Sequence, residues 1–187
     1  MPQELQLRTQ KALQGGLEFL AKSQQPDGSW IPLWFGNQYA PDDVNPTYGT
    51  ARVLRSLTVM SKQQPSLRAL AARLSARAIE WLVRSQNSDG GWGGAPGIRS
   101  SIEESALAVE ALGAARQFNV PRASVALEAG TDWLLERIET GQWTQPSPIG
   151  FYFAKLWYYE RLYPLIFTVG ALKQLQEPFK IGDERAW

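Results

Sequence analysis

The sequence predicts an all-α protein built from about three helical hairpins stacked side by side. A helix-turn motif occurs twice, 62 residues apart from Gln24 to Gln86, and a shortened third copy follows. Apolar residues recur at helical spacing along the chain, and we find no alternating pattern typical of strands. The chain of 187 residues is long enough for a sizeable core. We therefore expect residues 1–187 to form a single domain.

The helices are expected in order along the chain, each bounded by turn residues. The first covers residues 4–23, with Leu13, Leu17 and Leu20 on one apolar stripe, and the turn at Gly28 ends it. Further helices are expected over residues 47–60, 66–85, 101–117 and 121–139, and over the aromatic segment 146–175. The segments that start at Thr50, Ser105 and Thr168 align with one another, so the second helix of each hairpin repeats as well.

The repeated motif has an aromatic–aliphatic pair, then a glutamine, a glycine and a tryptophan. These positions are Gln24, Gly28 and Trp30 in the first copy, Gln86, Gly90 and Trp92 in the second, and Trp143 in the third, where the glutamine is lost. The glutamine follows the helix end, where carbonyl groups need donors. The glycine allows the chain to reverse, and the indole N–H suits a backbone oxygen. We interpret the motif as a staple between hairpins rather than a ligand site.

The aromatic member of each pair is Phe19, Trp81 or Trp133, and we expect it to face a neighbouring helix.

Composition excludes several kinds of chemistry. The chain has no cysteine and no histidine, which removes thiolate nucleophiles, histidine-based triads and the usual zinc sites. We therefore expect no metal and no cofactor. The net charge of +1 gives no electrostatic case for nucleic acid. No signal peptide is visible, and no apolar run approaches the roughly 20 residues that span a bilayer. The expected location is the cytoplasm, with contact at a membrane surface left open.

The two intact copies resemble the QW repeat of the triterpene cyclases, the squalene-hopene and oxidosqualene cyclases. The likeness extends to the Asp-Gly-Ser-Trp sequence ending at Trp30, followed by Tyr48-Gly49-Thr50, and to the turn around Trp92. The segment from Gly150 onward is similar to the family's C-terminal aromatic segment, with different spacing. The resemblance implies that the chain forms the C-terminal half of a catalytic (α/α)6 barrel, a terpenoid cyclase/prenyltransferase-like toroid.

The resemblance implies an apolar isoprenoid or triterpene precursor as ligand, held against aromatic rings that stabilise carbocations. The residues it places at the substrate are Tyr48, Phe151, Tyr152, Phe153 and Trp157. The family's acid motif, Asp-x-Asp-Asp, does not occur in these residues. Stand-alone cyclisation is therefore not expected, and the catalytic residues are unknown. Asp42 and Asp43 are weak candidates, since adjacent aspartates in a loop are commonly turn residues. Glu103 and Glu104 are interpreted as a helix-capping pair.

Two other functions stay open. One is a non-catalytic helical-repeat module that mediates interactions. The other is a fragment of a sugar-processing α/α barrel, for which Asp42 or Asp43 with Glu103 or Glu104 would supply carboxylates across a cleft. In each case half a toroid exposes the flanks of its end hairpins. We therefore expect a homodimer or a complex with a complementary cyclase half.

Overall fold

The structure, a computed structural model, describes residues 2–151 and 154–176. Within these residues it forms six α-helices, three short strands and three 3₁₀ turns. The helices are α1 (Gln3–Ser23), α2 (Pro46–Gln63), α3 (Arg68–Ser85), α4 (Ile102–Ala114), α5 (Pro121–Glu139) and α6 (Tyr163–Gln176). The helical hairpins that the repeats predict are therefore present, and the all-α class is confirmed.

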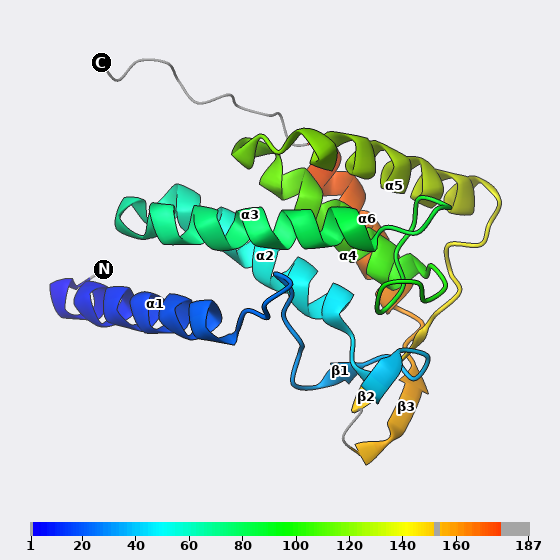
Figure 1. Ribbon diagram of the computed structural model, residues 1–187, viewed down its shortest axis with the longest axis horizontal. Helices are drawn as coiled ribbons and strands as arrows, with labels where there is room; N and C mark the ends of the chain where they lie inside the picture. Colours follow the sequence, from blue (N-terminus) through cyan, green and yellow to red (C-terminus); the bar gives the residue numbers. More distant parts are fainter. Residues whose placement is uncertain (1, 152–153, 177–187) are drawn as a thin grey trace.

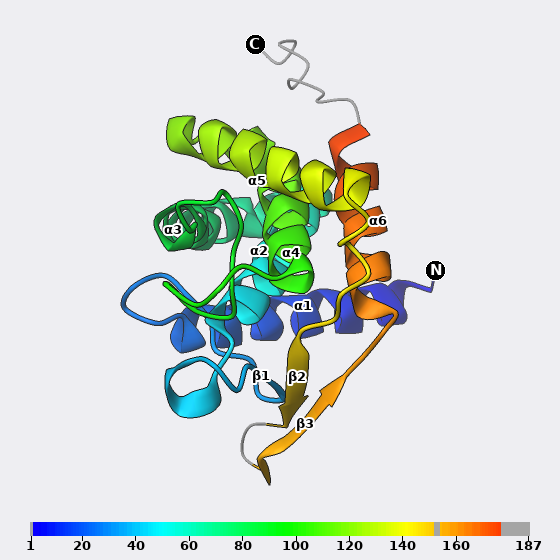
Figure 2. The same ribbon diagram turned by 90° about the vertical axis from the view of Figure 1, so that its right-hand side faces the viewer.

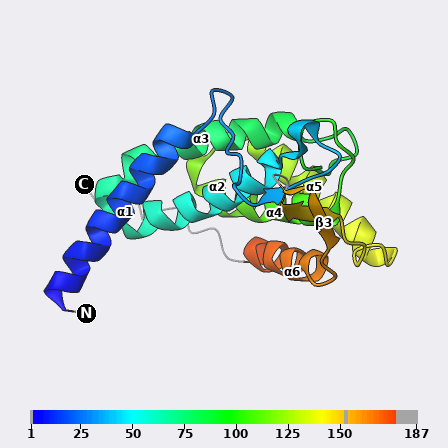
Figure 3. The same ribbon diagram turned by 90° about the horizontal axis from the view of Figure 1, so that it is seen from below.

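The helices form two curved layers. Helices α1, α3 and α5 lie in a row as the outer layer (Figure 1). Helices α2, α4 and α6 form the inner layer, where α4 packs between α2 and α6. Figure 2 shows α4 and α6 side by side, and Figure 3 shows α1 and α6 at separate edges of the molecule. The open row, with an end helix at each edge, is the arrangement expected of half a toroid.

The core fills the space between the two layers. Trp92 has no exposed surface, and it lies among leucines that are also buried. These leucines are Leu17, Leu54, Leu57, Leu74, Leu82, Leu107, Leu112 and Leu134. Because Trp92 and the leucines come from α1 to α5 and the turns between them, one contiguous core joins the hairpins.

Helix starts follow the cap chemistry for three of the helices. Asn45 caps α2 by accepting a hydrogen bond from the Tyr48 backbone N–H at 3.0 Å, and Ser101 caps α4 by accepting from the Glu104 N–H at 3.2 Å. Pro121 begins α5 as predicted. Ser66 does not cap α3, because it lies in a 3₁₀ turn (Pro65–Leu67) before that helix.

Residues 146–175 differ from the prediction of a helical segment. The chain first forms two strands, β2 (Pro148–Phe151) and β3 (Leu156–Tyr159), and α6 begins only at Tyr163. Strand β2 also pairs antiparallel with β1 (Phe35–Gly36), in the register Phe35 to Phe151. The pairing partner lies more than a hundred residues away, so no local pattern predicts it. The small sheet places the aromatic loop beside the C-terminal aromatic segment.

Candidate functional site

Two indole N–H groups close the repeated turns. Trp30 Nε1 donates to the Leu20 carbonyl at 2.9 Å, and Trp92 Nε1 donates to the Leu82 carbonyl at 2.8 Å. Each tryptophan thus reaches back ten residues onto the helix it follows. The carbonyls belong to the last turn of α1 and of α3, where helix carbonyls lack intrahelical donors.

The two motif glutamines connect successive outer helices. Gln24 Nε2 donates to the Gly28 carbonyl in its own turn and to the Leu74 carbonyl in α3. Gln86 Nε2 repeats the pattern with Gly90 and with Ala126 in α5. The structure therefore directs each glutamine to its turn and to the following outer helix, rather than to the end of its own helix.

Acidic turn residues add a second link of the same kind. Trp81 Nε1 on α3 donates to Asp27 Oδ2 at 2.9 Å, and Trp133 Nε1 on α5 donates to Asp89 Oδ2 at 3.1 Å. Trp81 and Trp133 are buried at the aromatic position of the motif, whereas Phe19 at the same position of α1 is 69% exposed. The expectation that Phe19 faces a neighbouring helix is not met within the described residues.

The aromatic cluster lies where the small sheet meets the starts of α2 and α6. We define it as six rings: Trp34, Phe35, Tyr48, Phe151, Tyr163 and Phe167. Phe35 and Tyr48 have ring centroids 4.5 Å apart, and Trp34 contacts Phe151 edge-on at 5.6 Å. Tyr163 stacks on Phe167 at 5.1 Å, and Phe167 contacts Tyr48 at 6.5 Å. These contacts join Phe35, Tyr48, Phe167 and Tyr163 in one group, and the pairing of Phe35 with Phe151 brings Trp34 and Phe151 beside it.

The rings of the cluster are only partly covered. Trp34 is 51% exposed, and the other five are half-buried. Burial raises the pKa of Tyr48 above its ordinary value of 10.0, with Arg52 acting in the opposite sense. The Tyr48 hydroxyl therefore stays neutral across physiological pH, and the cluster carries no charge of its own.

Of the residues predicted at the substrate, Tyr48 and Phe151 lie in the cluster. Trp157 does not: it is opposite Gly150 in the register, on the other face of the hairpin from Phe151 and its partner Leu156. Tyr152 and Phe153 lie outside the described residues. Sequence reasoning did not select Tyr163 and Phe167, although their spacing of four residues on a helix predicts a shared face.

Asp42 and Asp43 lie in a 3₁₀ turn (Pro41–Asp43), and both have φ of 57°. Asp42 is exposed, and the Asp43 carboxylate forms an ion pair with Lys155 between the two strands of the hairpin. The Asp43 carbonyl also accepts a hydrogen bond from the Asn37 N–H at 2.9 Å. This is the environment of turn residues that hold a loop, rather than of an acid ready to protonate an alkene.

Glu103 and Glu104 are both buried in the first turn of α4, with 4% and 3% of their surface exposed. Glu104 has the predicted capping contact with Ser101, but its carboxylate also accepts hydrogen bonds from side chains distant in sequence. Neither glutamate is free to face Asp42 or Asp43 across an open cleft, which is the geometry that sugar hydrolysis needs. This burial could not be predicted from the sequence, since glutamates are mostly exposed.

A cleft of about 590 Å³, lined by both polar and apolar side chains, lies beside this network. Asn37, Ser101 and Ser147 form part of its lining, together with Trp133 and Tyr159. In the described part of the chain, no group of three or more acidic side chains is placed to hold a metal ion.

Comparison with known proteins identifies the family to which these repeats belong. Residues 3–177 match the squalene-hopene cyclase C-terminal domain. This chain belongs to the squalene-hopene cyclase family. Similar proteins include enfumafungin synthase of Hormonema carpetanum, 32% identical over 80% of this chain and 10% of that protein. Squalene–hopene cyclase of Bradyrhizobium diazoefficiens is 28% identical over 84% of the chain and 24% of the relative.

Human lanosterol synthase is 28% identical over 81% of the chain and 20% of its own length. The chain thus spans between a tenth and a quarter of these cyclases. The family membership explains the stapled turns as the frame of a cyclase domain. No helix in residues 2–151 and 154–176 has both the length and the apolar character that a membrane crossing requires.

Proposed function

We propose that this chain forms part of the wall of an apolar isoprenoid-binding cavity, and that the acid needed to start cyclisation comes from outside these residues. The observation that carries the proposal is the half-exposed aromatic cluster at the starts of the inner helix α2 and of α6. Ring faces attract cations through their quadrupoles, and a cluster without charge suits an apolar chain. The names of the related cyclases agree with a ligand of this class.

The cluster is held rigidly, which is what stabilisation of a passing cation requires. Tyr48 begins α2 behind the Asn45 cap, and Phe35 is fixed to Phe151 by strand pairing. The rings are therefore set in place by backbone hydrogen bonds before any ligand arrives.

The test is binding of a polyprenyl amine, whose ammonium group resembles a carbocation, compared with a neutral polyprenyl alcohol of equal length. We expect the wild type to prefer the amine, and Tyr48→Leu to reduce that preference by about 5- to 30-fold, the range for one cation–ring contact. Trp143→Leu is the control, because this partly buried ring packs against the core and is not one of the six rings of the cluster. Equal binding of both ligands by the wild type would contradict the proposal.

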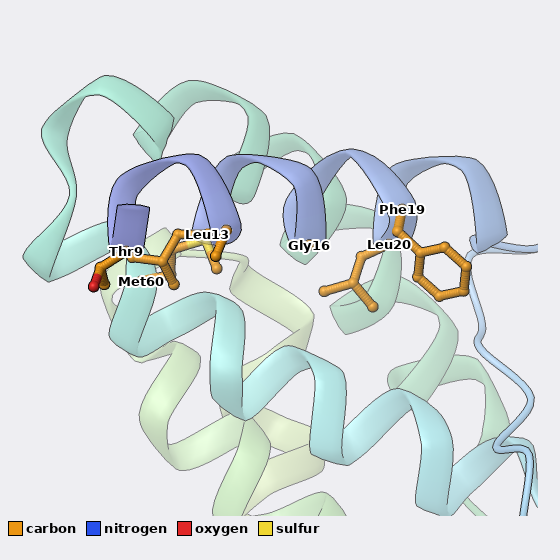
Figure 4. A pocket seen from close by; sticks show the side chains of 7 residues that line it. Thr9, Leu13, Gly16, Phe19, Leu20 and Met60 are labelled. Atoms are coloured by element: carbon orange, nitrogen blue, oxygen red, sulfur yellow. The ribbon is translucent and has the colours of Figure 1, made fainter. Parts of the chain in front are cut away.

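The complementary cyclase half is the partner that we propose for the exposed flanks. A groove of about 550 Å³ runs beside α1 and is lined by Leu13, Phe19, Leu20 and Met60 among others (Figure 4). The opposite flank, on α6, exposes more than half of Ile166 and Val169. Related cyclases are several times longer than this chain. They therefore contain additional residues that could cover flanks of this kind.

Co-expression tests this partner. The probe is the part of the Bradyrhizobium squalene–hopene cyclase that precedes the region similar to this chain. We expect a one-to-one complex that Phe19→Glu weakens, whereas Lys11→Glu, a charge change on the exposed face of α1, leaves it intact. A homodimer formed through the groove, or a monomer that ignores the added half, would each overturn the proposal.

A further inference from the structure

The buried carboxyl pair, Glu103 and Glu104, is the least expected feature of the structure. Adjacent acidic residues are rarely buried unless their charges are compensated, and here no cationic side chain supplies the compensation by any described contact. The compensation comes instead from neutral donors that belong to three other parts of the chain.

Glu104 accepts hydrogen bonds at both carboxylate oxygens. Oε1 accepts from Asn45 Nδ2 at 2.8 Å and from Asn37 Nδ2 at 3.3 Å. Oε2 accepts from the hydroxyls of Ser101 and Ser147, the latter at 3.3 Å. With four donors, the ionised form of Glu104 is well satisfied. This carboxylate therefore joins the loop before α2, the cap of α4 and the approach to β2.

Glu103 is satisfied on one side only. Its Oε1 accepts the Ser147 backbone N–H at 2.7 Å, whereas its Oε2 is buried and has no hydrogen-bond partner among the described residues. Burial, followed by the repulsion of Glu104, raises the pKa of Glu103 from 4.5 to about 7. A neutral Glu103 needs no further donors at Oε2, so the geometry fits the protonated acid.

The side chains in hydrogen-bond contact with the pair are neutral, whereas the charged side chains of Asp89, Arg99 and Arg137 line the neighbouring cleft. The groups that face it from the loop, the α4 cap and the β2 approach are the neutral side chains of Asn37, Asn45, Ser101 and Ser147. Asp43 and Lys155 pair with each other, and among the described residues Glu104 is the charged neighbour whose repulsion raises the pKa of Glu103. The cleft beside the network, which Asn37, Ser101 and Ser147 help to line, gives solvent protons a route to it.

We propose that Glu103 and Glu104 act together as a proton-dependent lock that holds the β2–β3 hairpin against the start of α4. Ser147 is the link: its N–H and its hydroxyl contact one glutamate each, and the next residue begins β2. Strand β2 carries Phe151 into the aromatic cluster. When Glu103 loses its proton, two adjacent buried negative charges repel each other and the hold on Ser147 weakens. The lock does not depend on what the cluster binds.

The test follows the hairpin through a pH titration of the whole chain. Incorporated 5-fluorotryptophan gives a ¹⁹F signal for Trp157 on β3, assigned with Trp157→Phe, and Trp92 in the core serves as reference. We expect the Trp157 signal to shift with a midpoint near pH 7, while the Trp92 signal stays constant. Amide hydrogen exchange in β2 and β3, corrected for the intrinsic effect of pH, should become about tenfold faster above that midpoint.

Two conservative variants distinguish a lock from simple structural support. Glu103→Gln imitates the protonated acid, so the hairpin should stay protected and the titration should vanish. Glu104→Gln removes the negative neighbour, so the midpoint should move to lower pH. Persistence of the titration in Glu103→Gln would overturn the proposal, as would a ¹⁹F shift that changes no exchange rate. If Glu103→Gln does not fold, two other results test the proposal. Wild-type exchange that does not change near pH 7, or a midpoint that does not move in Glu104→Gln, would each overturn it.

Discussion

The first two turns of this chain are stapled to the next outer helix, whereas the third is not. In the first two, the glutamine donates to α3 or α5 and the tryptophan closes back on its own helix. The third turn has no glutamine at the motif position, and its Trp143 is half-buried. Helix α5 is the last outer helix of the described residues, so no following outer helix lies there to receive a glutamine. The comparison shows that the intact motif both closes its own turn and connects it to the following outer helix.

The largest expected difference concerns the tryptophans. Trp92→Ala removes a fully buried ring and its hydrogen bond to Leu82, and should lower the free energy of unfolding by about 3–5 kcal/mol. Trp143→Ala should cost about 1 kcal/mol, because its ring is only partly covered. Chemical denaturation of both variants measures this, and equal losses would contradict a special role for the stapled turns.

The glycines provide a second, closely matched pair. Gly28 has φ of +101°, and an added Cβ would lie 2.6 Å from the Arg77 carbonyl oxygen of α3. Gly141 also has positive φ, +74°, but a Cβ there would meet nothing within 4 Å. We expect Gly28→Ala to destabilise by about 2–3 kcal/mol and Gly141→Ala by about 1 kcal/mol. The difference between the melting temperatures of the two variants measures how much the close contact between the Gly28 turn and α3 contributes to stability.

Gln86→Leu should have a smaller effect, since its side chain is only half-buried. It leaves the carbonyls of Gly90 and Ala126 without this donor, at a cost of about 1–2 kcal/mol. The control is Gln142→Leu in the third turn, an exposed glutamine that does not occupy the motif position, and there we expect almost no change. Equal losses in the two variants would contradict the contribution assigned to the Gln86 hydrogen bonds.

The smallest expected effect is a loss of folding stability at low pH, caused by protonation of Asp89. Burial raises the pKa of Asp89, but hydrogen bonds from Ser100, the Gly91 N–H and Trp133 outweigh burial and lower it below 3.8. A lowered acid pKa adds stability above the unfolded value and loses it as pH falls through the folded one. The free energy of unfolding should therefore decline below about pH 3.8, and Asp89→Asn should reduce that decline. An unchanged acid limb in Asp89→Asn would contradict this link.

Much of the frame could be predicted from sequence, because it rests on local and repeated signals. The helix α5 begins and ends where Pro121 and the following stripe indicate. The staples follow from the spacing of Gln, Gly and Trp, although their acceptors in the next outer helix could not be identified without the fold.

The rest of the site depends on contacts between distant residues. Phe35 and Phe151 meet only because β1 pairs with β2, and short aromatic runs fit a helix as well as a strand. Glu104 finds its partners at Asn37 and Ser147, far away on both sides in sequence. No property of a glutamate pair in a helix cap predicts this network.

The central claim is that these residues supply a cavity wall but not the acid. Incubation of the purified chain with squalene, followed by mass spectrometry of the extracted products, tests it most directly. We predict no cyclised product from the chain alone, because Asp-x-Asp-Asp does not occur in its sequence, and the described Asp43 is held by Lys155. A hopene-type product formed by the chain alone would contradict the account.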